Sequence, residues 1–273
     1  MERGPRSLFA RLSSRLPRAL PCTLLLLGAC APQPIAVTHE PASLRMVAAD
    51  SCAPLGEALA TAYEESRPWV TIHVETYNNE LAEETLLNGD ADLAFLSWVG
   101  ESDAGTFWTT PIASDDLAVI VHPASPLTDA NLALLQEIYR GRVQEWEGIV
   151  LAVVSREEGS GSRAAFDSAV LQGRDITLTA VVMPSNAAVV EYVAHTPGSI
   201  GYVSTLRLDA ALDGVRVLPV EGTMPSAGTA GDGAYPLSRT LHLATLGEPT
   251  GEGREFTQWA LGPEGQKIIQ AVP

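Results

Sequence analysis

Lysine is almost missing from this sequence of 273 residues, in which Lys267 is the only one. A nucleotide-binding P-loop carries a lysine directly after its glycines, so this class of site is excluded. Histidine is also scarce: the chain has five, and none belongs to an H-E-x-x-H motif or to a Cys/His pair at metal-ligand spacing. We therefore expect no metal centre and no cofactor.

The chain has three cysteines, and its acidic residues outnumber its basic ones by 33 to 17. Of the three cysteines, Cys22 and Cys30 lie near the start of the chain, which leaves Cys52 alone in the remainder and excludes an internal disulfide there. The formal net charge is −16. An acidic chain of this kind is a poor partner for nucleic acid or for an anionic membrane surface, and we expect neither.

The first thirty residues have the pattern of an export signal. Met1–Arg18 contains five arginines, Ala19–Leu27 is mostly apolar, and small residues then precede Cys30. The sequence Leu-Gly-Ala-Cys resembles the bacterial lipobox, in which the cysteine is lipidated. We predict a lipoprotein signal peptide over 1–29, lipidation of Cys30 and a flexible tether over 30–42, on the extracytoplasmic side of the cell membrane. An ordinary cleaved signal or a membrane anchor is the alternative.

The most informative stretch runs from Ile149 to Asp167. Leu151–Val154 predicts a buried strand, Arg156–Ser162 a polar turn, and Arg163 onwards a helix with Ser160 or Ser162 as its N-cap. The first N–H groups of a helix lack partners and carry partial positive charge. A strand that opens through such a turn into a helix therefore favours an anion.

The residues of this turn suit an oxyanion. Gly159 and Gly161 let the backbone approach a ligand closely, the hydroxyls of the two serines can donate, and Arg156 offers a two-pronged guanidinium. We predict a site for a tetrahedral oxyanion. The alternative is an ordinary strand–turn–helix connection that binds no ligand, which is common in α/β proteins. The turn does not match the G-x-S-x-G nucleophile elbow of hydrolases.

Three other predicted strands end in a small polar residue. Ligands of open α/β sheets bind beyond the carboxyl ends of strands, so we expect these residues near the same site. Two of them, Ser51 and Asn79, also stand where a helix N-cap is expected. The three residues and their strands are Ser51 after Leu44–Ala48, Asn79 after Thr71–Tyr77, and Ser97 after Ala91–Leu96.

Further strands and helices alternate along the chain, which predicts an α/β fold with mainly parallel, helix-covered sheets. Trp108 and Pro111 are expected in a loop before a strand at Leu117–Val121. Proline- and glycine-containing stretches near 122–126 and 221–233 suggest two crossovers between two lobes. The remaining predicted elements are helices at Pro54–Ser66, Glu80–Leu87, Thr128–Tyr139, Asn186–Ala194, Gly253–Leu261 and Gly265–Ala271, and strands at Ile176–Met183, Ser199–Ser204, Val215–Val220 and Leu237–Thr245.

Several segments resemble a known family in the right order. The turn Arg156–Ser162 resembles that family's R-x-x-G-S-G-T motif. The other matching segments are Ser51–Leu55, Ile138–Gly141 with Trp146, Thr196–Val203, Tyr235–Arg239 and Glu264–Lys267. Together they resemble the phosphate-binding protein of bacterial phosphate ABC importers, a type II solute-binding family.

The resemblance implies a two-lobed, periplasmic-binding-protein-like fold that closes on phosphate or a similar oxyanion and delivers it to the permease of an ABC importer. Lobe 1 would comprise 43–122 plus 223–273, and lobe 2 would comprise 123–222. A monomer without enzymatic activity is expected. The implied ligand-binding residues are Ser51, Cys52, Asn79, Ser97, Arg156, Gly159, Ser160, Gly161 and Ser162.

One position departs from the family. Ser97 stands where the family has an acidic residue that accepts a hydrogen bond from protonated phosphate, so discrimination against sulfate is expected to weaken. Four acids stand nearby in the sequence and could substitute for it: Asp50, Asp92, Glu101 and Asp103. The departure at Ser97 leaves an alternative open, namely a surface adhesin or sensor that keeps the fold and has altered or lost anion binding. A hydrolase that uses Ser160 or Ser162 would need a base, and none stands at a recognisable spacing.

Overall fold

The computed structural model describes residues 39–100, 105–208, 214–226 and 234–272, which belong to one compact unit. The predicted signal peptide, Cys30 and the tether up to residue 38 lie outside the described residues. The first strand begins at Ala42, the last residue assigned to the tether. Among the described residues, no helix has the length and apolar character needed to cross a membrane.

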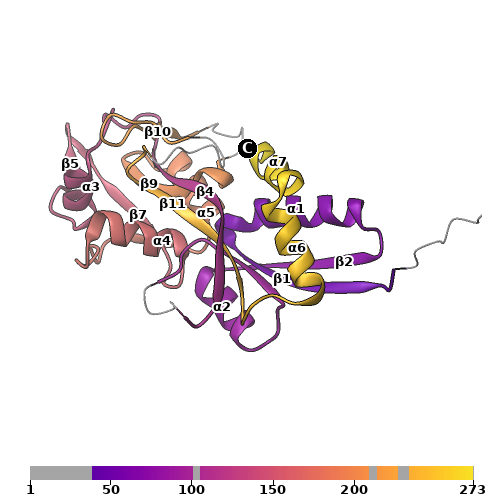
Figure 1. Cartoon of the computed structure of the whole chain (residues 1–273). Helices are drawn as coiled ribbons and strands as arrows, with labels where there is room; N and C mark the ends of the chain where they lie inside the picture. The colour runs from indigo at the N-terminus through magenta and orange to yellow at the C-terminus, as the bar shows by residue number, and fades with distance from the viewer. Residues whose placement is uncertain (1–38, 101–104, 209–213, 227–233, 273) are drawn as a thin grey trace, which may run out of the picture. The chain divides into compact units, whose positions relative to one another are not determined.

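Strands and helices alternate in much of the chain (Figure 1). The strands are β1 (Ala42–Ala49), β2 (Val70–Tyr77), β3 (Leu93–Leu96), β4 (Trp108–Val121), β5 (Glu145–Trp146), β6 (Ile149–Val150), β7 (Ala152–Arg156), β8 (Val181–Met183), β9 (Ser199–Ser204), β10 (Arg216–Leu218) and β11 (Ser238–Thr245). The helices are α1 (Ala53–Ser66), α2 (Asn79–Leu87), α3 (Leu132–Tyr139), α4 (Gly161–Phe166), α5 (Asn186–His195), α6 (Gly251–Leu261) and α7 (Pro263–Ala271).

Nine strands form one sheet in the order β2-β1-β3-β11-β4-β9-β7-β8, with β10 paired to β4. At one end β1 runs parallel to β2 and β3, and at the other β7 runs parallel to β8 and β9. Between these two parallel groups, β4 and β11 run antiparallel to each other and to their neighbours. The predicted α/β class is confirmed, with an antiparallel ribbon joining two parallel halves.

Strand β4 is much longer than predicted. The expectation that Trp108 and Pro111 lie in a loop was wrong, because β4 starts at Trp108 and pairs with β11 as far as Asp116. The register shifts between Leu241 and His242, which places His242 opposite Pro111. A proline cannot donate a ladder hydrogen bond, and such an irregularity is a common place to accommodate one. The pairing comes from a segment more than a hundred residues away.

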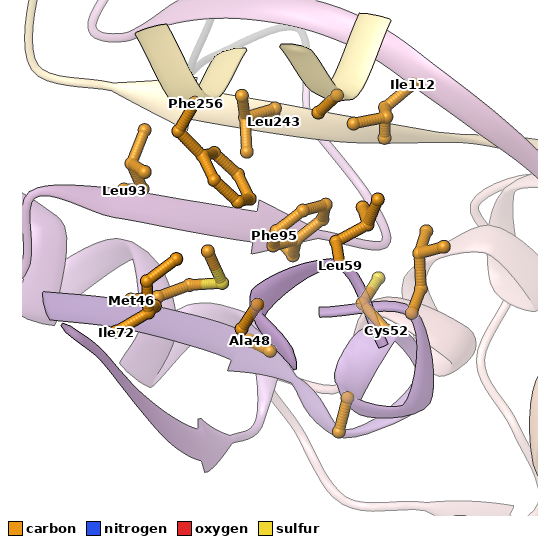
Figure 2. Close-up of a cluster of buried hydrophobic side chains, with 14 of the residues drawn as sticks. Met46, Ala48, Cys52, Leu59, Ile72, Leu93, Phe95, Ile112, Leu243 and Phe256 are labelled. Carbon is orange, nitrogen blue, oxygen red and sulfur yellow. The ribbon is translucent and has the colours of Figure 1, made fainter. Parts of the chain in front are cut away.

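Two main hydrophobic cores lie along this sheet. The first gathers side chains from β1, β3, α1, β11 and α6; Figure 2 shows Met46, Leu59, Phe95, Leu243 and Phe256 directed toward one another. Each of these five is at most 1% exposed. Burying a side chain of this size stabilises a fold by roughly 1.5–3 kcal/mol, so this cluster contributes strongly to stability.

The second core contains Tyr139, Phe166 and Tyr202, with the rings of Phe166 and Tyr202 stacked at 4.0 Å. Strand β4 serves both cores, since Ile112 belongs to the first and Leu117 to the second. Strand β11 and the residues just before it do the same in the opposite chain direction. The division into lobes at 122/123 and 222/223 stays a prediction.

Two other elements differ from expectation. Helix α3 was predicted from Thr128 and begins at Leu132, because the side chain of Asn131 accepts a 2.7 Å hydrogen bond from the N–H of Leu134 and caps it there. The strand predicted over Ile176–Met183 is reduced to β8, which pairs with β7 over three residues. Residues 128–131 before α3 and 176–180 before β8 belong to no helix or strand.

Candidate functional site

A small, partly open cavity lies where several strands end. Its walls leave about 150 Å³ between atoms. Seven of the nine predicted ligand-binding residues line it, and three other residues complete the wall. The seven are Ser51, Asn79, Ser97, Arg156, Ser160, Gly161 and Ser162, and the three are Ala49, Asp50 and Asn78.

Two predicted residues do not line this cavity. Cys52 is fully buried in the first core, where its thiol is free, and burial raises its pKa to about 12. A thiol in such surroundings behaves as a small apolar group. Gly159 lies beside the cavity, in a wider groove described below. The structure therefore brings most of the predicted set together and places these two apart from it.

The turn after β7 has the conformation that its glycines allow. Gly159 has φ +80°, and a Cβ there would come within 2.6 Å of Glu80. The carbonyl oxygen of Gly159 accepts a 3.0 Å hydrogen bond from the N–H of Glu80, which joins this turn to the start of α2. Gly161 packs so closely against Ser97 that any Cβ would overlap its hydroxyl. Only glycine fits at both positions.

Ser160 is the N-cap of α4, as one of the two sequence alternatives predicted. Its hydroxyl oxygen accepts a hydrogen bond from the N–H of Arg163. Ser162 follows in the first turn of the helix and is 1% exposed. Its hydroxyl has no hydrogen-bond partner among the described residues. A buried hydroxyl without a partner is costly, so this atom is available to a ligand in the cavity that Ser162 lines.

The other two predicted caps were wrong. Asn78, not Asn79, caps α2 by accepting from the N–H of Leu81, and Ser51 makes no side-chain cap of the 3-10 turn Asp50–Cys52 or of α1. Asn79 instead reaches the end of β3. Its side-chain oxygen accepts from the N–H of Ser97 at 2.8 Å and of Trp98 at 3.2 Å. This amide holds the wall of the cavity in place.

Arg156 is the only predicted site residue with a charge. It is 1% exposed, although arginine is rarely buried. Its Nε and Nη2 donate to the two carboxylate oxygens of Glu157, at 2.9 and 3.0 Å. Nη2 also donates to the carbonyl of Pro184, and Nη1 donates to Asp50 at 3.1 Å. The guanidinium is therefore fixed in one orientation at the edge of the cavity.

Asp50, one of the acids that stand near the predicted site in the sequence, lines the cavity. Its Oδ2 accepts from Arg156 Nη1 and from both the backbone N–H and the side-chain amide of Asn186, at 2.9 and 2.6 Å. Its Oδ1 accepts from Arg207 at 3.0 Å. Burial raises the pKa of the carboxyl, but these hydrogen bonds and the two arginines outweigh it and hold the pKa below its ordinary value. Its partners lie over a hundred residues away, so no local signal reveals this role.

A wider groove, with about 790 Å³ between its atoms, adjoins the cavity and shares Asn79, Ser160 and Gly161 with it. Four carboxylates line this groove together with Trp98 and one cation, Arg163. The four are Glu80, Glu83, Glu158 and Asp167. The groove is therefore mainly acidic, while the cavity beside it presents hydroxyls, two amides, Arg156 and Asp50. Among the described residues, no group of three or more His, Cys, Asp or Glu side chains could hold a metal ion.

Comparison with known proteins assigns the fold to a family. The sequence pattern of the PBP superfamily domain matches residues 36–264. The chain belongs to the PBP superfamily. It is 27% identical over 237 residues to the phosphate-binding protein PstS of Bacillus subtilis (strain 168), covering 83% of this chain and 78% of that protein. It is 24% identical over 260 residues to PstS of Pseudomonas aeruginosa (PAO1), covering 83% and 80%.

Solved structures agree with these relatives. An ABC-type phosphate transport receptor from Vibrio cholerae superposes with a TM-score of 0.70 at 26% identity, over 84% of this chain and 98% of that one. A crystal structure from Clostridium perfringens with bound phosphate superposes with a TM-score of 0.75 at 26% identity, over 84% and 97%. The predicted resemblance to the phosphate-binding proteins of ABC importers is confirmed.

Proposed function

We propose that the protein is an extracytoplasmic solute-binding protein that captures phosphate, or a similar tetrahedral oxyanion, for an ABC importer. The relatives supply the class of function, since PstS proteins are phosphate-binding proteins. The observation that carries the proposal here is the hydroxyl of Ser162, which is buried without a partner in a cavity that Arg156 also lines. An oxyanion between them would accept from both groups.

The other polar groups of the cavity fit the same ligand. Ser51, Ser97 and Ser160 bring further hydroxyls, and a tetrahedral oxyanion can accept from several donors at once. The protein would perform no covalent chemistry on the ligand. Capture would use hydrogen bonds alone, and the bound anion would be passed on intact to the permease subunits of the importer.

Opening is required for the ligand to enter. The cavity is too narrow to hold a ligand as it stands, because Gly161 lies directly against Ser97 across it. In our proposal the segment with Arg156 and Ser160–Ser162 separates from the segment with Asn79 and Ser97 and then closes again on the anion. Such hinge closure is a common way for two-lobed binding proteins to enclose a ligand.

The cellular setting belongs to the proposal as well. Export by the signal peptide over 1–29 and lipidation at Cys30 would hold a monomer at the extracytoplasmic face of the cell membrane, next to the permease. Metabolic labelling with a palmitate analogue tests the anchor, since the wild-type chain should incorporate the label and Cys30→Ser should not.

Calorimetric titration of the full chain in mild detergent tests the binding function. We expect heat from phosphate at both about pH 6 and about pH 8, conditions between which phosphate changes its charge. Sulfate serves as the second anion. If a folded protein gives no heat with phosphate, the proposal is wrong.

A second candidate is a surface adhesin or sensor that keeps the fold but has lost anion binding. The contact that favours it is the ion pair of Arg156 with Asp50, because a carboxylate of the protein already engages the cavity's guanidinium. This candidate predicts no heat with phosphate or sulfate and no shift of the thermal unfolding midpoint in their presence.

A further inference from the structure

Four charged side chains form a connected group, of which two line the cavity. Two are arginines and two are carboxylates, so their formal charges sum to zero. They are Arg156, Arg207, Asp50 and Glu157. The charge on Arg156 is thus balanced by the protein itself, and most of the group is withdrawn from water.

Asp50 lies at the centre of this group. Its side chain is 14% exposed and touches both arginines, whereas Glu157 reaches only Arg156. Every element packed around its carboxylate contributes a donor: Arg156 from β7, Arg207 from the 3-10 turn Thr205–Arg207, and Asn186 from the start of α5. No second acid faces it directly among these contacts. Among the described residues, Asp50 is the one carboxylate that lines the cavity.

The hydrogen bonds of Arg156 show how many of its N–H donors remain for a ligand. A guanidinium has five N–H donors. Four are used in the described contacts, one by Asp50, two by Glu157 and one by Pro184. One N–H of Nη1 remains for an anion. The cavity consequently offers a ligand dipoles and a single guanidinium N–H, with no net charge behind them.

We propose that Asp50 is a specificity-determining residue that balances Arg156 and so makes the cavity select a singly charged tetrahedral oxyanion, such as dihydrogen phosphate, over a doubly charged one. This inference rests on the proposed function and names the charge state of its ligand. A buried negative charge beside the site repels a dianion twice as strongly as a monoanion, and low local dielectric magnifies the difference. Sulfate is doubly charged near neutral pH, so the same residue works against it without any acid at position 97.

The test is calorimetric titration of the full chain with phosphate and with sulfate, between about pH 5.5 and about pH 8, where phosphate passes from monoanion to dianion and Asp50 stays ionised. The wild type should bind phosphate more weakly as pH rises and sulfate weakly throughout. Asp50→Asn removes one negative charge at nearly constant size. We expect it to strengthen sulfate binding by about tenfold or more and to flatten or reverse the pH dependence for phosphate.

A second variant removes a positive charge instead of a negative one, so it should shift the anion preference in the opposite direction. A purely structural effect would not do so. Arg207→Gln removes a positive charge from the other oxygen of Asp50, at a residue that does not line the cavity. It should weaken sulfate binding further and steepen the pH dependence for phosphate. Asp50→Glu restores the charge and should recover the wild-type preference. Asp92→Asn is the matched control, because Asp92 pairs with Arg45 on the surface and should leave both affinities unchanged.

The outcomes separate this inference from the proposed function. If the wild type binds phosphate but Asp50→Asn lowers both affinities equally at every pH, Asp50 is a structural residue and the inference is overturned. If Asp50→Asn fails to fold, Arg207→Gln decides alone, and an unchanged sulfate affinity overturns the inference. If the folded wild type binds neither anion, the proposed function fails together with it.

Discussion

Asp115 and Arg239 face each other on β4 and β11 and form a buried ion pair, with 2.7 Å between Oδ2 and Nη2. Their side chains are 0% and 4% exposed. The carboxylate also accepts hydrogen bonds from the hydroxyl of Ser204 and from the N–H and hydroxyl of Thr205. This network lies where both strands change from one hydrophobic core to the other.

Breaking this pair should be severe. Arg239→Met leaves the carboxylate of Asp115 buried without its counter-charge, and we expect the free energy of unfolding to fall by about 3–5 kcal/mol. The double variant Asp115→Leu/Arg239→Met should lose less than the sum of its two single variants. Urea denaturation measures both. Arg45→Met is the control, because its pair with Asp92 is exposed and should contribute less than about 1 kcal/mol.

Ser162→Ala should separate binding from stability. The hydroxyl has no partner among the described residues, so its removal should leave the unfolding midpoint unchanged or raise it slightly. Loss of a donor to an anion should weaken phosphate binding by roughly ten- to a hundredfold. Ser160→Ala is the counterpart, since it removes the cap of α4 and should cost about 1 kcal/mol of stability. Equal phosphate affinity in Ser162→Ala and wild type would contradict the proposed site.

Gly161→Ala should obstruct the cavity. A Cβ at this position would overlap the hydroxyl of Ser97 and approach Asn79 within 2.9 Å, so the two walls would have to move apart. We expect phosphate affinity to fall by roughly ten- to a hundredfold, as overpacking typically costs 1–3 kcal/mol. Gly253→Ala in α6 is the control: a Cβ there meets nothing, and the helix should become slightly more stable.

Acid should reveal the ionised state of Asp50. Its pKa in the folded protein lies below the ordinary 3.8, so its contribution to stability is present above that value and is lost as pH falls through the folded pKa. Asp50→Asn should therefore be less stable than wild type by about 1–3 kcal/mol at neutral pH, because charged hydrogen bonds are lost. The gap should stay constant down to about pH 4 and shrink below it. A gap that narrows between pH 7 and pH 5 would argue against this assignment.

The sequence predicts those parts of the fold whose signals are local. Strand β7, its glycine-containing turn and the cap Ser160 follow one another within a dozen residues, and all were predicted. The first half of β4 was missed because its hydrogen bonds come from β11, which only the folded chain brings near. Pro111 argued correctly against an ordinary central strand, but the bulge opposite it resolves the conflict.

The candidate site divides in the same way. Ser51, Asn79 and Ser97 follow from the rule that polar residues gather where strands end, since each needs only its own segment to be placed. Asp50 stands next to Ser51 in the sequence, yet its importance depends on Arg156, Asn186 and Arg207. The balance of charge between the two arginines and the two carboxylates exists only once all four are brought together, so it cannot be predicted from any one segment.

The long ladder between β4 and β11 also constrains how the molecule can deform. Strand β4 carries side chains of both cores, and β11 serves the first core while Leu237 just before it serves the second. Eight residue pairs join the two strands. Such a ladder of hydrogen bonds keeps the two strands in register, so they cannot slide past each other without breaking it. The opening proposed above for ligand entry would therefore have to bend both strands together, close to the buried pair of Asp115 and Arg239.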